Sequence, residues 1–302
     1  MATGDTKLKL FYKTFLKKRA LIDSSIVGSC TKPFRYLVNF RHLTNYSAAL
    51  FDENPLLYEN GEDAPVMHPL FPSRISWQMV ERLDLLWDVR FPVDLRDHLI
   101  HQGEYLEILQ PLKPGNELKV KATLISLRPH KLGVKITIRF EYCNKSGVQL
   151  IKEYVSAIVL GVRCSDDGRS IGEIPQMERR QITGDYFSEI IEISALDSYI
   201  YDGCSDIVNP IHTNREYARS MGLPGILLQG TATLARSVSV ISKHIPGAHA
   251  KITALAGKFT GYVLPPDRLT VNFIKNASGD YFFETLNRKN EYVIRGGYLK
   301  IG

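Results

Sequence analysis

The feature that most constrains this chain is an internal repeat. The segment Asp52-Glu53-Asn54-Pro55-Leu56-Leu57 resembles Asp206-Ile207-Val208-Asn209-Pro210-Ile211-His212, and the two Asn-Pro pairs lie 155 residues apart (209 minus 54). A second pair of similar segments, around Leu118 and Leu269, follows at an offset of 151 (269 minus 118). Two pairs of similar segments in the same order and at nearly the same offset predict that one folding unit occurs twice.

A break in the sequence pattern lies near the middle of the chain. Residues 164–182 are rich in charged and turn-forming residues and show little apolar periodicity, which is typical of an exposed linker. We therefore predict an N-terminal basic segment over 1–30, a first unit over 31–163, a linker over 164–182 and a second unit over 183–302. The length of 302 residues suits two domains of ordinary size.

Each half shows the same order of expected elements: a short strand, a helical stretch, the Asn-Pro loop, a longer helix and then three or four strands. Opening strands are expected at 35–40 and 187–193, and the longer helices at 73–87 and 228–244, where apolar residues recur at helical spacing. Alternating segments predict strands at 119–124, 135–140, 149–160, 269–274, 281–286 and 292–301. Strands in hairpin succession with one covering helix per half predict an α+β fold with antiparallel sheets.

Composition excludes several classes of protein. The net charge of +6 suits an anionic ligand, but basic and aromatic residues do not interleave on a strand pair, so nucleic-acid binding is not expected. No run of 18 apolar residues occurs, so no membrane span is expected. The chain also lacks the H-E-x-x-H, G-x-S-x-G and G-x-G-x-x-G motifs of common metal, serine-nucleophile and dinucleotide sites.

Two features bear on the compartment. The four cysteines form no C-x-x-C pair, which favours a reducing compartment, and we expect the cytoplasm. The first 23 residues alternate basic and apolar side chains, which favours a solvated basic helix and leaves organellar targeting open.

The residues that carry chemistry gather between positions 201 and 240. Asp206, Asn209 and His212 fall on one tight loop, which Pro210 stiffens. Gly230 follows His212 by 18 residues (230 minus 212) at the expected start of a helix, where a backbone N–H has no intrahelical partner. A carboxylate base, an imidazole proton carrier and an oxyanion donor in one segment suit chemistry next to a carbonyl group.

These motifs resemble the MaoC-like (R)-specific enoyl-CoA hydratase/dehydratase family, whose signature is Asp-x-Asn-Pro-(Leu/Ile)-His, a Gly-x-Pro segment and a His-Gly at a helix start. The matching residues are Asn209-Pro210-Ile211-His212, Gly222-Leu223-Pro224-Gly225 and Gln229-Gly230. The resemblance implies a double hot dog fold, in which two antiparallel sheets each wrap a central helix and pack as a pseudo-dimer. It also implies addition of water to a trans-2-enoyl thioester of CoA or of acyl carrier protein, or the reverse, without a metal or redox cofactor.

By the resemblance, Asp206, His212, Asn209 and Gly230 are the catalytic residues. The family carboxylate lies two residues before the Asn, whereas Asp206 lies three before Asn209. Counting without a gap puts Ile207 in the carboxylate position, and one inserted residue restores Asp206. Gln229 stands where the family has His, which is tolerable because the donor there is the next backbone N–H.

The first half keeps Asp52, Asn54 and Pro55 at the family spacing, but Leu57 stands where the family has His. We therefore expect a degenerate site in this half. The resemblance implies that this half accommodates the acyl chain, in a tunnel lined by apolar residues that also suit an ordinary core: Leu56, Leu57, Val66, Met67, Leu70 and Phe71.

Other functions stay open at this point. Hot dog folds also serve thioesterases, and a decayed site would leave an acyl-CoA binding module without catalysis. The individual residues also have structural interpretations: Asp206 and Asn209 as turn or capping residues, His212 as a hydrogen-bonded histidine and Gly230 as a packing glycine. A homodimer of the double unit is compatible with the resemblance.

Overall fold

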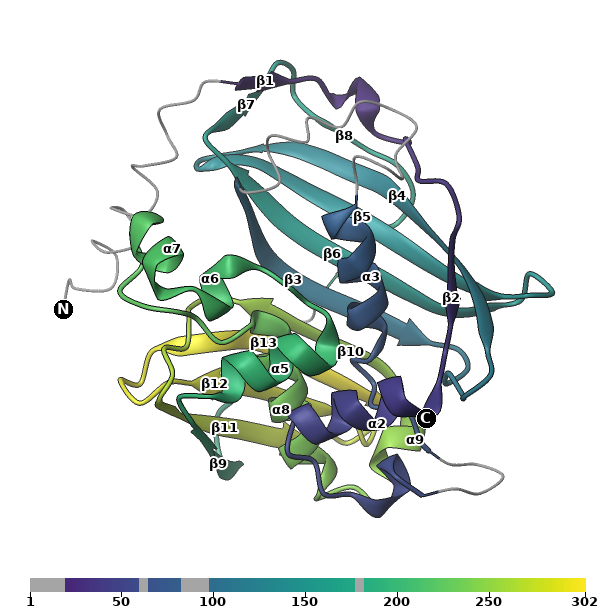
Figure 1. The fold of residues 1–302 in the computed structure, drawn as a ribbon, viewed down its shortest axis with the longest axis vertical. Coiled ribbons are helices and arrows are strands. Elements are labelled where there is room, and N and C mark those ends of the chain that lie inside the picture. The colour runs from purple at the N-terminus through teal and green to yellow at the C-terminus, as the bar shows by residue number, and fades with distance from the viewer. Residues whose placement is uncertain (1–19, 60–64, 83–97, 177–181) are drawn as a thin grey trace.

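In the computed structural model, the described residues are 20–59, 65–82, 98–176 and 182–302 (Figure 1). The predicted basic segment therefore lies mostly outside the described residues, as do the end of the first long helix and part of the linker. Residues 20–22 form a strand, β1 (Ala20–Ile22), so the helix expected over the first 23 residues is wrong at its end.

One continuous sheet of antiparallel neighbours runs through both halves, in the order β2-β4-β5-β6-β3-β10-β13-β12-β11-β9. The first-half strands are β2 (Phe34–Leu37), β3 (Leu99–Ile108), β4 (Glu117–His130), β5 (Gly133–Asn144) and β6 (Gln149–Leu160). The second-half strands are β9 (Phe187–Ile193), β10 (Ile252–Phe259), β11 (Asp267–Lys275), β12 (Tyr281–Leu286) and β13 (Tyr292–Ile301). The short strand β8 (Arg169–Ser170) adds to β4, and β1 pairs in parallel with β7 (Val162–Cys164).

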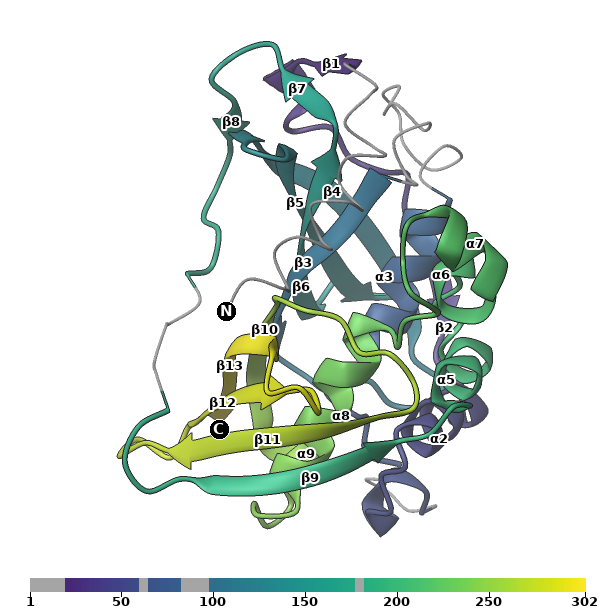
Figure 2. The same cartoon turned by 90° about the vertical axis from the view of Figure 1, so that its left-hand side faces the viewer.

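The halves join where β3 pairs with β10, with Glu104 opposite Gly257. Gly257 is required there because a Cβ at this position would lie 2.7 Å from the Leu234 side chain of the helix packed on the strand. The sheet curves around two buried helices, α3 (Pro72–Glu81) in the first half and α8 (Gly230–Ser242) in the second (Figures 1 and 2).

Two further helices, α2 (Phe40–Ala49) and α5 (Asp197–Ser205), pack against each other on the side of α3 and α8 that faces away from the sheet (Figure 2). The buried hydroxyls of Tyr46 and Tyr201 meet there at 3.1 Å. These tyrosines lie 155 residues apart, the same offset as the two Asn-Pro pairs. Equivalent residues that touch each other indicate that the pseudo-two-fold axis passes between them.

Most expected elements form, with shifted ends. The expected strands 149–160, 187–193, 281–286 and 292–301 match β6, β9, β12 and β13 at both ends. The strand expected at 35–40 ends at Leu37, because Asn39 caps α2 by accepting a hydrogen bond from the His42 N–H at 2.7 Å. The helix expected at 228–244 is shorter, and the central strands β3 and β10 were not predicted.

Among the described residues, no helix has both the length and the apolar character needed to cross a bilayer.

Candidate active site

The second-half loop begins where α5 ends. Asp206 closes the helix with a left-handed backbone (φ 53°), and Ile207 then turns into the core, where it is 5% exposed. Asn209 is exposed, and its side-chain oxygen accepts a hydrogen bond from the Ile211 N–H at 3.1 Å. That bond caps the short helix α6 (Pro210–Thr213), with Pro210 at its first position.

His212 has a defined tautomer. Its Nδ1 lies 2.9 Å from the Leu227 carbonyl oxygen, which can only accept, so Nδ1 carries the proton and Nε2 is a free acceptor. Burial lowers the pKa of His212 to about 4, and the Leu227 carbonyl opposes that shift. The imidazole is therefore neutral at pH 7, and among the described residues no hydrogen bond occupies Nε2.

The segment that leads into α8 is tied to the same loop. The Leu227 N–H donates to the Ile211 carbonyl at 3.1 Å, next to His212, and α8 begins three residues after Leu227 at Gly230. The Gly230 N–H lies at the open N-terminal end of the helix, outside the intrahelical ladder. A Cβ on Gly230 would lie 3.1 Å from the ring of Phe259, so a glycine suits this close approach. The structure thus brings His212, Asn209 and Gly230 into one region.

Asp206 does not join this group. Its carboxylate pairs with the guanidinium of Arg74 on α3, which also donates to the Tyr36 hydroxyl. The Asp206 side chain is 49% exposed, and no hydrogen bond or ion pair links it to His212 within the described residues. Its expected role as catalytic base stays a prediction, one that this geometry does not support.

The first-half loop has the same backbone shape. Phe51 follows α2 with a left-handed backbone (φ 56°), and Asp52 comes next. Asn54 caps a short 3-10 helix, Pro55–Leu57, by accepting from the Leu56 N–H at 3.1 Å. Because each left-handed residue stands three before its Asn, Asp206 corresponds to Phe51 and Ile207 to Asp52. The backbone therefore supports the count without an inserted residue.

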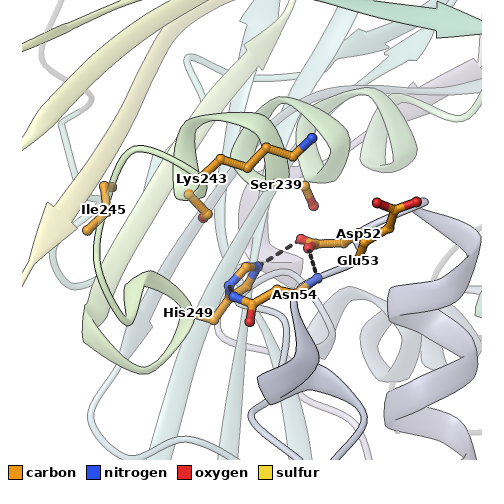
Figure 3. A pocket seen from close by; sticks show the side chains of 8 residues that line it. Asp52, Glu53, Asn54, Ser239, Lys243, Ile245 and His249 are labelled. Atoms are coloured by element: carbon orange, nitrogen blue, oxygen red, sulfur yellow. Dashed lines mark hydrogen bonds and ion pairs between the residues drawn. The ribbon is translucent and has the colours of Figure 1, made fainter.

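Asp52 meets an imidazole from the other half of the chain. His249, on α9 (Ala248–Lys251), places Nε2 at 3.0 Å from the Asp52 carboxylate (Figure 3). Both side chains are buried, and the Asn54 N–H also donates to Asp52 at 3.1 Å. Burial alone would raise the pKa of Asp52, but hydrogen bonds from His249 and Ser239 and the charge of nearby imidazoles outweigh it and lower the pKa to about 2.

Sequence reasoning singled out Asp52 and missed His249. The two residues are 197 positions apart, so no local spacing signals their contact. The same reasoning inferred, from Leu57 in the family's histidine position, that the first half has lost its proton carrier. The structure shows that another imidazole lies beside the retained carboxylate.

Asp52, His68 and His249 are also close enough to hold a cation, with candidate ligand atoms within 4.8 Å of one another. The hydrogen bonds oppose that use. The Leu70 N–H donates to Nδ1 of His68 at 3.1 Å, so a neutral His68 carries its proton on Nε2, which faces the Ser239 hydroxyl at 3.3 Å. The lone pair that a metal would need is therefore absent from that nitrogen.

A third titratable cluster lies under α3. Glu104 and Glu153 are fully buried, and Glu153 accepts from the hydroxyls of Ser76 (2.7 Å) and Tyr142. His101 Nε2 lies 2.9 Å from Glu104, whose pKa burial raises to about 7. The inner face of the first-half sheet is thus partly polar. Of the six apolar residues expected to line a tunnel, Leu57, Met67, Leu70 and Phe71 are buried, and Leu56 is 38% exposed.

Comparison with known proteins shows which proteins this chain is similar to. Residues 178–295 match the family described as MaoC like domain. Among curated proteins, the chain is 22% identical over 294 residues to the peroxisomal enoyl-CoA hydratase 2 of Arabidopsis thaliana, covering 88% of this chain and 91% of the relative. It is 22% identical over 250 residues to the peroxisomal multifunctional enzyme type 2 of Drosophila melanogaster, covering 81% of this chain and 41% of the relative.

A shorter match, 37% identical over 78 residues, links the chain to the fatty acid synthase subunit beta of Aspergillus oryzae. It covers 25% of this chain and 4% of that subunit. The chain thus spans less than half the length of both the synthase subunit and the multifunctional enzyme.

The fold agrees with the family match. A MaoC-like dehydratase from Phytophthora capsici superposes with a TM-score of 0.78 at 18% identity, covering 91% of this chain and 96% of that one. The molecule is therefore a double hot dog protein of the α+β class, as the sequence predicted. The family model matches part of its second half, residues 178–295.

Proposed function

We propose that this protein is a hydro-lyase that adds water to a trans-2-enoyl thioester, giving a 3-hydroxyacyl thioester, or catalyses the reverse reaction. The observation that carries the proposal is the bond between His212 Nδ1 and the Leu227 carbonyl, which leaves Nε2 as an acceptor on a ring tied to the segment that leads into α8. The match to the MaoC-like domain and the similarity to enoyl-CoA hydratase 2 support the choice of reaction.

In the proposed site the Gly230 N–H binds the thioester oxygen and stabilises the enolate charge that develops. Neutral His212 accepts a proton from water through Nε2 while the water oxygen bonds to C3, and the same imidazole can return a proton to C2. Asn209 holds the loop that presents His212. These roles need no metal or redox cofactor. The acyl carrier, CoA or acyl carrier protein, is the expected partner.

The test is incubation of the protein with a series of trans-2-enoyl-CoA thioesters, beginning with crotonyl-CoA, and measurement of the loss of enoyl absorbance. We expect saturable hydration of at least one chain length. Release of free thiol without hydration would instead show a thioesterase, and binding without turnover would show an acyl-CoA binding module. Either result contradicts the proposal.

We also propose the cytoplasm as the compartment, to be tested by microscopy of the tagged chain. A homodimer is the assembly that we expect light scattering of the purified protein to show. Neither point affects the chemistry of the site.

A further inference from the structure

A cavity of about 380 Å³ lies against the first-half loop, far along α8 from Gly230 (Figure 3). Its lining is mainly polar and comes from both halves of the chain: Asp52, Glu53, Asn54, Ser239, Ser242, Lys243, Ile245 and His249. The cavity thus combines the first-half loop with the C-terminal end of α8 and with α9, which both belong to the second half.

Hydrogen bonds fix the protons in this cavity. Because the Asn54 side-chain oxygen accepts from the Leu56 N–H, its amide nitrogen is the group that faces His249 Nδ1, at 3.2 Å. That nitrogen donates, so Nδ1 of His249 accepts and Nε2 carries the proton that is donated to Asp52. A carboxylate that holds an imidazole in one tautomer, with the opposite ring nitrogen basic, is the arrangement that activates many catalytic histidines.

Two groups that line the cavity can stabilise negative charge on a ligand. The Ser242 hydroxyl is buried at 5% exposure and, within the described part of the chain, has no hydrogen-bond partner. Lys243, the next residue, is exposed and also lines the cavity. A hydroxyl and an ammonium side by side suit an oxygen that gains negative charge during reaction.

A second pocket, of about 580 Å³, adjoins the first through Ser239 and Lys243, which line both. Its wall includes several apolar side chains: Leu50, Phe51, Ile190, Ile191, Ile193 and Val240. Phe51 is 50% exposed and Ile190 59% exposed, so the pocket opens to the surface. The other half of the twelve lining residues is polar and includes the ion-paired Asp197 and Arg236. A polar cavity that adjoins a pocket with one apolar wall fits a ligand that carries a reactive carbonyl on a hydrocarbon chain.

We propose that the first half holds a second acid–base site for acyl thioesters, with His249 as the catalytic residue, Asp52 as its positioning residue and the acyl chain in the adjoining apolar pocket. The inference rests on the proposed hydration reaction and adds a centre to it. Water replaces the Asn54 amide at His249 Nδ1, and that nitrogen takes a proton from the water as the water oxygen bonds to C3 of the enoyl thioester. The double-bond electrons move to an enolate, whose oxygen faces Ser242 and Lys243. His249 then returns the proton to C2, so one water is added and the imidazole is again neutral.

The experiment compares His249→Gln with His244→Gln in the full chain. His244 is a matched control because it lies five residues away and pairs with Glu189 outside the cavity, at 2.9 Å. Because the His212 centre would continue to hydrate the substrate, both variants are made in a His212→Gln background, where the remaining rate is that of the proposed second centre. With the enoyl substrate at low concentration, loss of its acid–base group should lower the residual kcat/KM of the His249 variant about 100-fold or more. The control should keep the residual kcat/KM of His212→Gln.

Separate outcomes distinguish the two proposals. Hydration by the unaltered protein, with no residual rate in His212→Gln or with a residual rate that His249→Gln leaves unchanged, overturns the second site and leaves the proposed function standing. No hydration by the unaltered protein overturns the function itself. If His249→Gln does not fold, nitrogen NMR of labelled histidine in the unaltered protein decides the point. Saturation with 3-hydroxybutyryl-CoA should shift the Nδ1 signal of His249, and an unmoved signal overturns the site.

The adjoining pocket has its own variant. Val240 is partly exposed on α8 and lines the adjoining pocket, so Val240→Trp should fill it. We expect KM to rise several-fold more for trans-2-decenoyl-CoA than for crotonyl-CoA, with kcat for crotonyl-CoA retained. An equal change in KM for both substrates would show that the acyl chain does not occupy this pocket, and it would overturn that part of the proposal.

Discussion

The two Asn-Pro loops share a backbone and divide the acid–base residues between them. The first-half loop keeps the carboxylate, Asp52, and has Leu57 where the family has an imidazole. The second-half loop keeps the imidazole, His212, and has the buried Ile207 in the carboxylate position. Neither loop alone carries the full pair. The first half regains an imidazole because His249 reaches it from α9 of the other half.

The helix starts differ in the opposite sense. In the second half, α8 begins with Gly230, whose N–H can bind an oxyanion. In the first half, α3 begins with Pro72, which has no N–H to offer. The second half thus offers the backbone donor, and the first half offers the carboxylate–imidazole pair. A duplicated unit can lose different parts of its site in each copy when the other copy, or a new contact, supplies the remainder.

The largest expected effect tests this contrast at the helix starts. In Gly230→Ala the new Cβ would lie 3.1 Å from the Phe259 ring, so either the ring or the first turn of α8 must shift. In a His249→Gln background, where only the His212 centre remains, a displacement of this kind at an oxyanion donor should lower kcat/KM for hydration by about 10- to 100-fold. Pro72→Ala is the matched control and should retain the rate. Equal rates for both variants would show that the Gly230 amide does not bind the thioester.

The buried and exposed carboxylates should differ in stability. The Asp52 side chain is 3% exposed and the Asp206 side chain is 49% exposed. Asp52→Asn should lower the free energy of unfolding by about 3 kcal/mol, because the buried carboxylate accepts from the N–H groups of Asn54 and His249 with separate oxygens and an amide keeps only one acceptor. Asp206→Asn should lower it by about 1 kcal/mol or less, since water screens a half-exposed pair. Urea unfolding of both variants measures this difference, and a reversed order would contradict the assignment of the two positions.

The hydration rate of Asp206→Asn tests whether this carboxylate takes part in catalysis. A catalytic base at this position would make Asp206→Asn lose about 10²–10⁴ in rate. The pairing with Arg74 and the separation from His212 lead us to expect a change of less than about 3-fold, within the range of a surface substitution. Steady-state hydration with crotonyl-CoA distinguishes these outcomes. A loss in the larger range would restore Asp206 as the base.

The sequence predicted the architecture better than the site. The offset of 155 residues between the Asn-Pro pairs was enough to infer the duplication, and apolar alternation placed most strands. The central strands β3 and β10 were not predicted because their alternation of polar and apolar residues is interrupted. Glu104 faces the core on β3, and Gly257 lies close to the Leu234 side chain on β10. Tertiary contacts, rather than local pattern, decide such strands.

The site was only partly predictable for a similar reason. His212 and Gly230 are close in sequence, so their motif could be recognised. Whether Asp206 matches the family carboxylate depended on whether the loop holds one inserted residue. The left-handed backbone at Asp206 answers that question, but Asp tolerates this conformation as well as Gly does, so the sequence did not reveal it. His249 came from a distant segment without a motif of its own. Long-range pairing of titratable groups therefore needs coordinates.

The smallest effect expected is a pH dependence that separates the loops. Burial lowers the pKa of His212 to about 4 and that of His68 to about 3, whereas the unfolded chain binds these protons near 6.5. Between these values the unfolded state holds more protons, so stability is fully present above about pH 6.5 and falls as the pH drops toward 4. His212→Gln should flatten the slope of unfolding free energy against pH between about 4.5 and 6.5. A slope identical to that of the unaltered protein would mean that His212 is not held neutral by the fold, and the acceptor role of its Nε2 would lose its physical basis.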